Sequence, residues 1–316
     1  MPALAILFPG QGAQHPGMGI DWLDHDPVAA KTLDEASRIL GYDLAAVLAS
    51  EDRSLDDTLV TQPAIVVSSL VAYKALLRRH PLRPAAFAGF SLGEWTALGA
   101  AGVFDFESLL RFVRIRAEAM QAAAKVRPGA MAAVLGLSSE QVRAICEAVA
   151  TPSAIVVPAN QNCPGQVVLS GDASAVARAA ELAKSAGAKR VVPLNVSGAF
   201  HSPLMAHAAE RLERALATAE PLSASAPVWS NVTAAPHGKS DLRRTLVRQV
   251  VEPVRFEATI RAMRATGITH FIEIGPGSVL SGFVRKIDPT AAVARLDGPD
   301  GLPELEGWLK EHGLVE

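Results

Sequence analysis

Ser91 stands in the run GFSLGEW (89–95), where its glycine neighbours complete a G-x-S-x-G pattern. This pattern indicates a nucleophile only where a strand precedes it and a helix follows, because the sharp turn between them lifts the serine Oγ clear of the backbone. We predict a strand over 84–90 and a helix over 92–100. The N–H groups at the start of that helix would favour negative charge developing beside Ser91. A serine in an ordinary surface turn is the alternative, and the flanking elements favour the nucleophile.

A serine nucleophile needs a base, and His201 is the histidine in the most defined position. It stands in SGAFHSPLM (197–205), between the end of a predicted strand and a helix that Ser202 and Pro203 would open as N-cap and first residue. Loops held in this way often carry catalytic groups. With an ordinary pKa of about 6.5, a histidine there can take a proton from Ser91 and return it to a leaving group.

Arg116 is the most informative single residue, because it lies on an apolar face of a predicted helix over 106–124. Leu109, Phe112 and Met120 precede or follow it at helical spacing and share that face. An arginine on an apolar face is costly unless its charge is matched. Two explanations are open. The side chain reaches solvent or a local acid, or it binds a carboxylate of the substrate through two parallel hydrogen bonds.

Short apolar strands alternate with longer helices along most of the chain, which is the order of an α/β protein. Outside the middle of the chain we predict strands over 3–8, 84–90 and 268–275, and helices over 61–79, 92–100, 106–124 and 203–219. From residue 126 to 199 the order becomes strand, helix, strand, strand, helix, strand, which is that of a ferredoxin-like unit. Its first helix is opened by a capping box from Ser138 to Gln141. We therefore predict a large α/β domain, formed by 1–125 and 200–316, with an inserted α+β domain over 126–199.

The composition is that of an ordinary globular protein, with 316 residues, 49% of them apolar and 20% charged. A formal net charge of −2 gives no electrostatic reason to expect a nucleic acid or an anionic membrane as partner. Cys146 and Cys163 form no metal-ligand pattern, so no metal is expected, and reduced thiols favour the cytoplasm. The first residues do not resemble a signal peptide. No stretch is expected to approach the ~20 apolar residues of a membrane helix.

Several runs together resemble the malonyl-CoA:acyl carrier protein transacylases and the related acyltransferase domains of fatty acid and polyketide synthases. They follow the family's order and span nearly the whole chain. The matching runs are FPGQGAQ (8–14), TQPAI (61–65), GFSLGE (89–94), R-x-x-x-MQ (116–121), NQNCPGQVVLSG (160–171), SGAFHSPLM (197–205), VWSNVTA (228–234), RQVVEPVRF (248–256) and EIGPG (273–277). The resemblance implies a large domain with a hydrolase-like parallel sheet and an inserted ferredoxin-like domain, which agrees with the order of elements.

The resemblance also implies a reaction and roles for four matching residues. Ser91 would attack the thioester of malonyl-CoA to form a malonyl-enzyme, with His201 as general base and then general acid. After CoA leaves, the phosphopantetheine thiol of acyl carrier protein would take the malonyl group in a ping-pong cycle. The backbone N–H groups of Gln11 and Leu92 would form the oxyanion hole.

Two further positions complete the implied site. The Arg116 guanidinium would hold the malonyl carboxylate and exclude uncharged acyl chains. A backbone carbonyl orients the family's histidine, and the matching position is Gln249, which accounts for the lack of an obvious triad acid. No cofactor is implied beyond the substrate malonyl-CoA, and family analogy favours a monomer.

The sequence departs from the family pattern at four positions. Phe90 stands where a histidine is common, Trp95 replaces a tyrosine, Ala117 replaces a glycine, and Ser278 stands where a lysine is usual. The change at Phe90 removes a possible polar contact beside the nucleophile. The change at Ser278 would weaken contact with CoA or carrier phosphates. None of the four is a residue that the resemblance assigns to catalysis.

Other functions remain open beside malonyl transfer. The same serine turn could serve an acyl-thioester hydrolase, although Arg116 has no use in removing neutral acyl groups. A transacylase for an alkylmalonyl group is a second alternative, against which GAFHS together with Arg116 favours malonyl. A malonyl-CoA-binding or carrier-docking subunit without activity is a third. The sequence leaves open whether the carrier serves fatty acid synthesis, polyketide synthesis or malonate decarboxylation.

Overall fold

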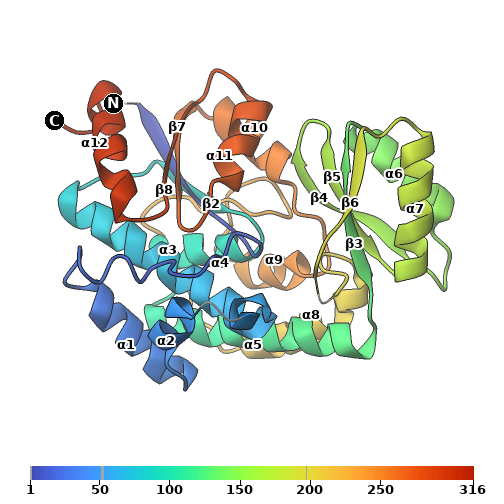
Figure 1. The fold of residues 1–316 in the computed structure, drawn as a ribbon, viewed down its shortest axis with the longest axis horizontal. Coiled ribbons are helices and arrows are strands. Elements are labelled where there is room, and N and C mark those ends of the chain that lie inside the picture. The colour runs from blue at the N-terminus through green and yellow to red at the C-terminus, as the bar shows by residue number, and fades with distance from the viewer. Residues whose placement is uncertain (1, 51–52, 197) are drawn as a thin grey trace. The chain divides into compact units, whose positions relative to one another are not determined.

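Two four-stranded sheets organise the chain (Figure 1). The computed structural model describes residues 2–50, 53–196 and 198–316. These residues form two units, which we describe separately. The first comprises Met1–Arg114, Glu220–Ser230 and Ala262–Glu316, and the second comprises Ile115–Ala219 and Asn231–Arg261. A parallel sheet in one unit and an antiparallel sheet in the other confirm the predicted fold class. The domain boundaries predicted at 126 and 199 stay a prediction.

The first unit contains the parallel sheet, with strand order β2-β1-β7-β8. Its strands are β1 (Ala3–Phe8), β2 (Ala86–Gly89), β7 (Ile268–Ile274) and β8 (Ala292–Leu296). Strands β1 and β7 are central: β1 is apolar throughout and buried after its first residue, and β7 is buried over its last four residues, as expected for strands covered on both faces. In the β1–β2 pair, Phe8 lies opposite Gly89, so both strands end at the same level. The segments that follow these two strands therefore begin side by side.

The first unit also contains several helices, some of which pack directly on this sheet. They are α1 (Ala29–Leu40), α2 (Leu44–Ala49), α3 (Thr58–Arg79), α4 (Leu92–Ala100), α11 (Val279–Ile287) and α12 (Leu302–Glu311), and α5 (Phe106–Val126) begins in this unit. Helix α4 packs against β1 and β2, whereas α11 and α12 pack against β8. Helix α3 begins three residues before the predicted start, because the Asp57 carboxylate accepts a hydrogen bond from the Leu59 N–H at 2.9 Å.

Helix α3 corrects the expectation that no stretch approaches the composition of a membrane helix. By length and composition alone, its 22 residues could cross a membrane. However, 83% of its most apolar 18-residue window is buried within the protein. This burial agrees with a sequence in which apolar residues occupy more than one face of the helix.

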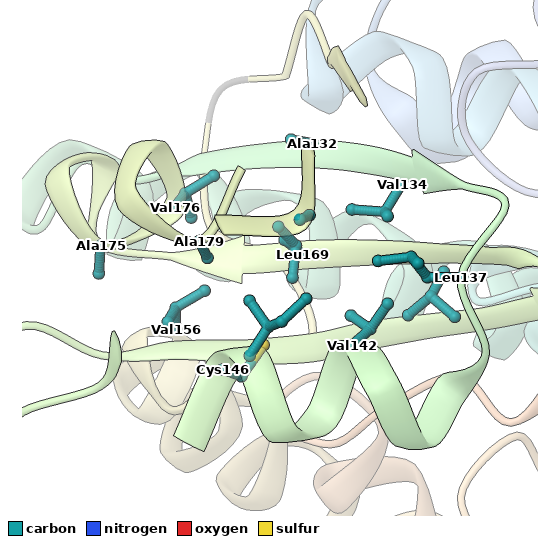
Figure 2. Close-up of a cluster of buried hydrophobic side chains, with 13 residues drawn as sticks. Ala132, Val134, Leu137, Val142, Cys146, Val156, Leu169, Ala175, Val176 and Ala179 are labelled. Atoms are coloured by element: carbon teal, nitrogen blue, oxygen red, sulfur yellow. The ribbon is translucent and has the colours of Figure 1, made fainter. Parts of the chain in front are cut away.

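The second unit contains the antiparallel sheet, with strand order β4-β5-β3-β6. Its elements follow as β3 (Ala130–Leu135), α6 (Ser139–Val149), β4 (Val156–Cys163), β5 (Gln166–Gly171), α7 (Ala173–Ser185) and β6 (Arg190–Pro193). This is the predicted ferredoxin-like order, and the capping box from Ser138 to Gln141 is present. Figure 2 shows the apolar core that α6 and α7 form with the strands, including Val134, Val156 and Leu169.

The second unit also contains the later part of α5, together with α8 (Ala206–Leu216), α9 (Leu242–Gln249) and most of α10 (Phe256–Ala265). A short 3₁₀ turn over Pro203–Met205 precedes α8, where the sequence predicted one continuous helix. The segment between α9 and α10 pairs with β4. The Gln161 N–H donates to the Val254 carbonyl at 2.8 Å, and the Val254 N–H donates to the Ala159 carbonyl at 2.9 Å. These bonds tie the chain that follows α9 to the antiparallel sheet.

Candidate active site

Ser91 occupies the turn between β2 and α4, as predicted. Its backbone has φ 51° and ψ −102°, a conformation that residues other than glycine rarely adopt. Such a conformation costs about 1–3 kcal/mol and persists only where the surroundings impose it, most often at functional sites. Leu92 is the first residue of α4, so its N–H is among those that have no acceptor within the helix. The turn thus presents a serine hydroxyl beside a helix N-terminus.

The two glycines of the motif allow this turn because backbone atoms of neighbouring segments lie too close to them for a side chain to fit. A Cβ placed on Gly89 would lie 2.0 Å from the carbonyl carbon of Gly93, and one on Gly93 would lie 2.0 Å from the carbonyl oxygen of Phe8. No side chain fits at either distance. Glycine at both positions therefore lets β1, β2 and α4 approach closely enough to hold Ser91 in its strained conformation.

Gln11 lies in the loop that follows β1, next to the serine turn. The loop passes so near the turn that a Cβ on Gly10 would lie 2.5 Å from the carbonyl oxygen of Phe90. The Gln11 side-chain amide donates to the Thr58 hydroxyl at 3.2 Å, which holds the loop to the start of α3. Gln11 follows β1, and Leu92 follows β2. Because these two strands end at the same level of the sheet, the backbone N–H groups of Gln11 and Leu92 belong to neighbouring segments.

His201 belongs to the second unit and sits in the short connection that precedes α8. Its backbone also has a positive φ of 57°, and the residue is 3% exposed. Ser202 fixes this connection, because its hydroxyl donates to the Ala199 carbonyl at 2.6 Å and accepts from the Leu204 N–H at 3.3 Å. The predicted N-cap role of Ser202 is thereby confirmed, although the helix that it caps is the 3₁₀ turn.

The His201 ring is oriented by the carboxyl end of α9. Its Nδ1 lies 2.8 Å from the carbonyl oxygen of Gln249, the last residue of that helix. The last carbonyls of a helix have no acceptor role within the helix, so this oxygen is available to the ring. Because a carbonyl can only accept, Nδ1 of the neutral ring carries the proton and Nε2 carries the lone pair. This is the tautomer that a general base needs.

The surroundings of His201 keep the ring neutral. Burial lowers its pKa from 6.5 to about 4, and the positive charge of Arg116 acts in the same direction. Hydrogen bonds to the backbone of Gln249 and Glu252 oppose this shift by favouring the charged ring. Burial is the larger cause. At neutral pH the imidazole is therefore a base rather than a cation.

Arg116 lies on α5 and is 1% exposed, so its guanidinium does not reach solvent. Its Nη2 donates to the side-chain oxygen of Gln249 at 3.3 Å. Two different groups of Gln249 make these contacts: the backbone carbonyl accepts from His201, and the side-chain amide oxygen accepts from Arg116. The sequence assigned to Gln249 only the first of these. A buried glutamine at the end of a short polar helix carries no periodic signal that would have predicted the second.

The six predicted residues fall into two groups. Ser91, Leu92 and Gln11 lie at the ends of β1 and β2 in the first unit, and His201, Arg116 and Gln249 lie together in the second. Within the described ranges, no three histidine, cysteine, aspartate or glutamate side chains are grouped to hold a metal ion. The chemistry that these groups can support is nucleophilic attack by a serine, proton transfer by a neutral histidine and recognition of an anion by an arginine.

The departures from the family pattern lie around these groups. Phe90 packs against Phe283 of α11, with ring centroids 6.3 Å apart. Trp95 and Ala117 are completely buried and belong to the apolar core. Ser278 is exposed at the N-terminus of α11. Three of the four substitutions therefore add or adjust apolar packing, and one changes the surface.

Comparison with known proteins places the chain in a family. Residues 6–293 match the model of the acyl transferase domain. The chain is 41% identical over 314 residues to the malonyl CoA-acyl carrier protein transacylase of Bacillus subtilis (strain 168), which covers 99% of both proteins. The chain belongs to the acyl transferase domain family.

Solved structures agree with this assignment. A crystal structure from Streptococcus pneumoniae, described as MCAT, superposes with a TM-score of 0.91 at 44% identity, covering 96% of this chain and 98% of that one. A complex of a malonyl-transacylase with its type II polyketide synthase acyl carrier protein also has a TM-score of 0.91. Its identity is 39%, and it covers 96% of this chain and 99% of that one.

Proposed function

We propose that this acyltransferase moves the malonyl group from malonyl-CoA to the phosphopantetheine thiol of acyl carrier protein through a malonyl-serine intermediate. The proposal rests on the full-length similarity to malonyl CoA-acyl carrier protein transacylases and on a similar enzyme solved in complex with an acyl carrier protein. It also rests on the chemistry of the two residue groups. Acyl carrier protein is the macromolecular partner, and malonyl-CoA is the small-molecule substrate.

In the first half of the reaction, the Ser91 Oγ attacks the thioester carbonyl carbon while His201 Nε2 takes the hydroxyl proton. The backbone N–H groups of Gln11 and Leu92 stabilise the negative charge that develops on the carbonyl oxygen. The tetrahedral intermediate collapses, the carbon–sulfur bond breaks, and His201 returns the proton to the departing CoA thiolate. An ester between Ser91 and malonate remains.

In the second half, the carrier thiol gives its proton to His201 and its sulfur attacks the ester carbonyl. The carbon–oxygen bond breaks, and the proton returns to Ser91 Oγ. Both halves use the same base and the same oxyanion donors, as a ping-pong cycle requires. The Gln249 carbonyl keeps His201 in one tautomer throughout, and the nearby end of α9 favours the transient imidazolium. The cycle needs no cofactor.

The buried Arg116 is the observation that carries the malonyl assignment. A guanidinium removed from water is costly unless a ligand or partner matches it, and a carboxylate matches it best. A malonyl group offers a carboxylate two bonds from the thioester carbonyl, whereas acetyl and longer neutral acyl groups offer none. The position of Arg116 beside the residue that orients His201 puts anion recognition close to the proton-transfer group.

Mass spectrometry of the intact protein tests the proposal. After mixing with malonyl-CoA, a malonyl adduct is expected on Ser91 and absent from Ser91→Ala. Acetyl-CoA should label the wild-type protein poorly, and Arg116→Ala should lose the preference for malonyl. Adding acyl carrier protein should move the adduct to the carrier rather than to water. Equal labelling by acetyl-CoA would refute the role of Arg116, and release of malonate without transfer would identify a hydrolase.

We also infer a monomeric, cytoplasmic protein that binds neither nucleic acid nor membrane. Both cysteines are buried thiols, and burial raises the pKa of the Cys146 thiol to about 12, which keeps that thiol protonated and unreactive. The balanced net charge offers no attraction to polyanions. Light scattering at increasing concentration tests the oligomeric state, where a mass twice that of the chain would contradict it.

A further inference from the structure

An ion pair in the first unit joins the loop after β1 to the loops that follow β7 and β8. His15 lies in the first of these loops, and its Nε2 is 3.2 Å from Oδ1 of Asp297, the residue that follows β8. The other carboxylate oxygen of Asp297 accepts from the Gly277 N–H, in the loop after β7, at 3.0 Å. One carboxylate therefore connects three loops at the carboxyl ends of neighbouring parallel strands.

The hydrogen bonds of His15 require a protonated ring. Its Nδ1 is 3.0 Å from the Pro16 carbonyl oxygen, and its Nε2 faces the Asp297 carboxylate. Both of these partners only accept hydrogen bonds. A neutral imidazole has one N–H and satisfies one of them, whereas the imidazolium has two and satisfies both. The pair is therefore complete only while the ring carries its second proton, and both side chains are exposed enough for the ring to exchange that proton with solvent.

The charged groups around the His15 ring favour that proton. Burial opposes it and is the largest single influence on the pKa of the ring. The hydrogen bonds of the ring, together with the negative charges of Asp297 and Asp21, outweigh burial and raise the pKa above its ordinary value of 6.5. The Asp21 carboxylate lies beside both loops, since a Cβ on Gly17 or Gly298 would come within 3.5 or 3.3 Å of its oxygens. The pair is thus lost only when the pH rises through this raised pKa.

The loop that His15 anchors also carries Gln11, whose backbone N–H is one of the two proposed oxyanion donors. Only three residues separate Gln11 from His15. Between them lies Ala13, whose Cβ and carbonyl oxygen would each be 3.7 Å from a Cβ on Gly277. The Asp297 carboxylate therefore holds this loop in two ways, directly through His15 and indirectly through the loop after β7. An oxyanion donor acts only at hydrogen-bond distance, so a small displacement of the loop would weaken its effect.

We propose that the ion pair between protonated His15 and Asp297 positions the Gln11 N–H for the oxyanion, so that deprotonation of His15 slows acylation without weakening substrate binding. This inference rests on the proposed acyl transfer, in which Gln11 is an oxyanion donor. His15 and Asp297 are positioning residues, because they act through Gln11 rather than on the substrate. The oxyanion forms only in the transition state, so the effect belongs to the rate constant and not to the KM for malonyl-CoA.

The pH dependence of the first half-reaction tests this inference. The rate constant for acylation of Ser91 by saturating malonyl-CoA is measured by mass spectrometry of the intact protein, from about pH 5.5 to about pH 8.5. The carrier thiol, which itself titrates at alkaline pH, takes no part in this half. His201 causes no alkaline loss, because its pKa is lowered to about 4 and its ring stays a neutral base as the pH rises. The amplitude of acylation reports the competent fraction of the protein, and the rate constant reports the geometry of the site.

Three variants of the full-length protein and one control separate the ion pair from a general effect on folding. His15→Gln and Asp297→Asn each remove one of the two charges. His15→Arg keeps a cation that does not titrate in this range. His80→Gln is the matched control, because His80 also lies 3.2 Å from a carboxylate, that of Glu306, in the same unit but outside the loop after β1.

We expect the wild-type rate constant to fall as the pH rises through the pKa of His15, with the KM for malonyl-CoA unchanged. His15→Gln and Asp297→Asn should have the low rate constant at every pH, roughly three- to tenfold below the wild-type value at the acidic end, which is less than the loss from removing an oxyanion donor outright. His15→Arg should keep the higher rate constant across the range. Nuclear magnetic resonance titration of the His15 ring should give a pKa above 6.5 that coincides with the fall in rate.

Four outcomes would overturn the role of the pair: a wild-type rate constant that stays level while His15 titrates, an alkaline fall that persists in His15→Arg, a loss in His80→Gln as large as that in His15→Gln, or a loss of amplitude alone in the variants. Failure of the proposed function looks different. If no adduct forms on Ser91 at any pH, the acyl transfer and this inference are both wrong. If acetyl-CoA labels Ser91 as well as malonyl-CoA does, the malonyl preference is wrong, and the same pH series decides the role of the pair with either thioester.

Discussion

In the Arg116→Gln variant the pKa of His201 is expected to rise, because the cation that disfavours a second positive charge is gone. In the wild-type protein the pKa is lowered from 6.5 to about 4, chiefly by burial and next by Arg116. Loss of one nearby like charge typically shifts a pKa by roughly one unit, which corresponds to about 1.4 kcal/mol in the free energy of protonation. Burial remains in the variant, so the pKa should stay below 6.5.

The difference is large enough to see at one pH. At pH 5.5, a histidine with an ordinary pKa is roughly 90% protonated, one with a pKa of 4 is roughly 3% protonated, and one with a pKa of 5 is roughly a quarter protonated. Nuclear magnetic resonance of the imidazole carbons reports this fraction directly. The His201 signal is assigned by its loss in His201→Gln. Arg114→Gln removes the same charge from an exposed position on the same helix and is the control that should leave the pKa unchanged.

Stability gives an independent measure of the same shift. Between pH 4 and 6.5 the unfolded chain binds more protons at His201 than the folded protein does, because the folded pKa is the lower one. The free energy of unfolding should therefore fall as the pH is lowered through this window, by up to about 3 kcal/mol from this residue. His201→Gln should lose that part of the acid sensitivity. Titration of wild-type His201 near pH 6.5, or an unchanged pKa in Arg116→Gln, would refute the reasoning.

Three further substitutions, two in the second unit and one in the first, test the stability of the fold. Ala234 has a positive φ of 52°, so Ala234→Gly should raise the free energy of unfolding by about 0.5 kcal/mol, and a lower melting temperature would contradict this. Glu273 is buried and accepts from the N–H groups of Leu280 and Ser281 at 3.0 and 2.8 Å, so Glu273→Gln, which leaves one of them facing an NH₂ group, should cost about 1–3 kcal/mol in denaturant unfolding. Ser138→Ala removes the capping box of α6 and should cost about 1 kcal/mol, with faster amide exchange in α6 as the local signature.

The strand and helix around Ser91 were predictable because local patterns encode them. The apolar run of β2, the glycines on both sides of the serine and the start of α4 all lie within about a dozen residues. The ferredoxin-like order was predictable for the same reason, since each helix and strand there has its own periodicity and the capping box marks the start of α6. In both cases the sequence pattern that predicts an element lies within the residues that form it.

The groups around His201 could not be derived in this way. Helix α9 is short and polar, with LRRTLVRQ as its sequence; its buried positions recur at helical spacing, but only Leu242 and Leu246 among them are apolar, which is too sparse a pattern to predict a helix. Which carbonyl at a helix end meets a histidine 48 residues away depends on tertiary packing. For Gln249 the sequence offered the backbone role only through a family resemblance. For Arg116 it left two explanations open, and the structure excludes solvent while giving the guanidinium an amide oxygen as acceptor.

The pairing of Val254 with β4 bears on how the antiparallel sheet could be isolated. A fragment that ends at residue 199 would lack this partner and would present β4 as a bare edge strand. Such an edge is a template for strand addition by another copy, which leads to aggregation. A fragment for transplantation into another scaffold would therefore need the returning segment, or a lysine or proline substitution along β4, to remain dispersed. The segment around Val254, which holds the chain after α9 to the sheet, therefore also prevents β4 from pairing with another copy.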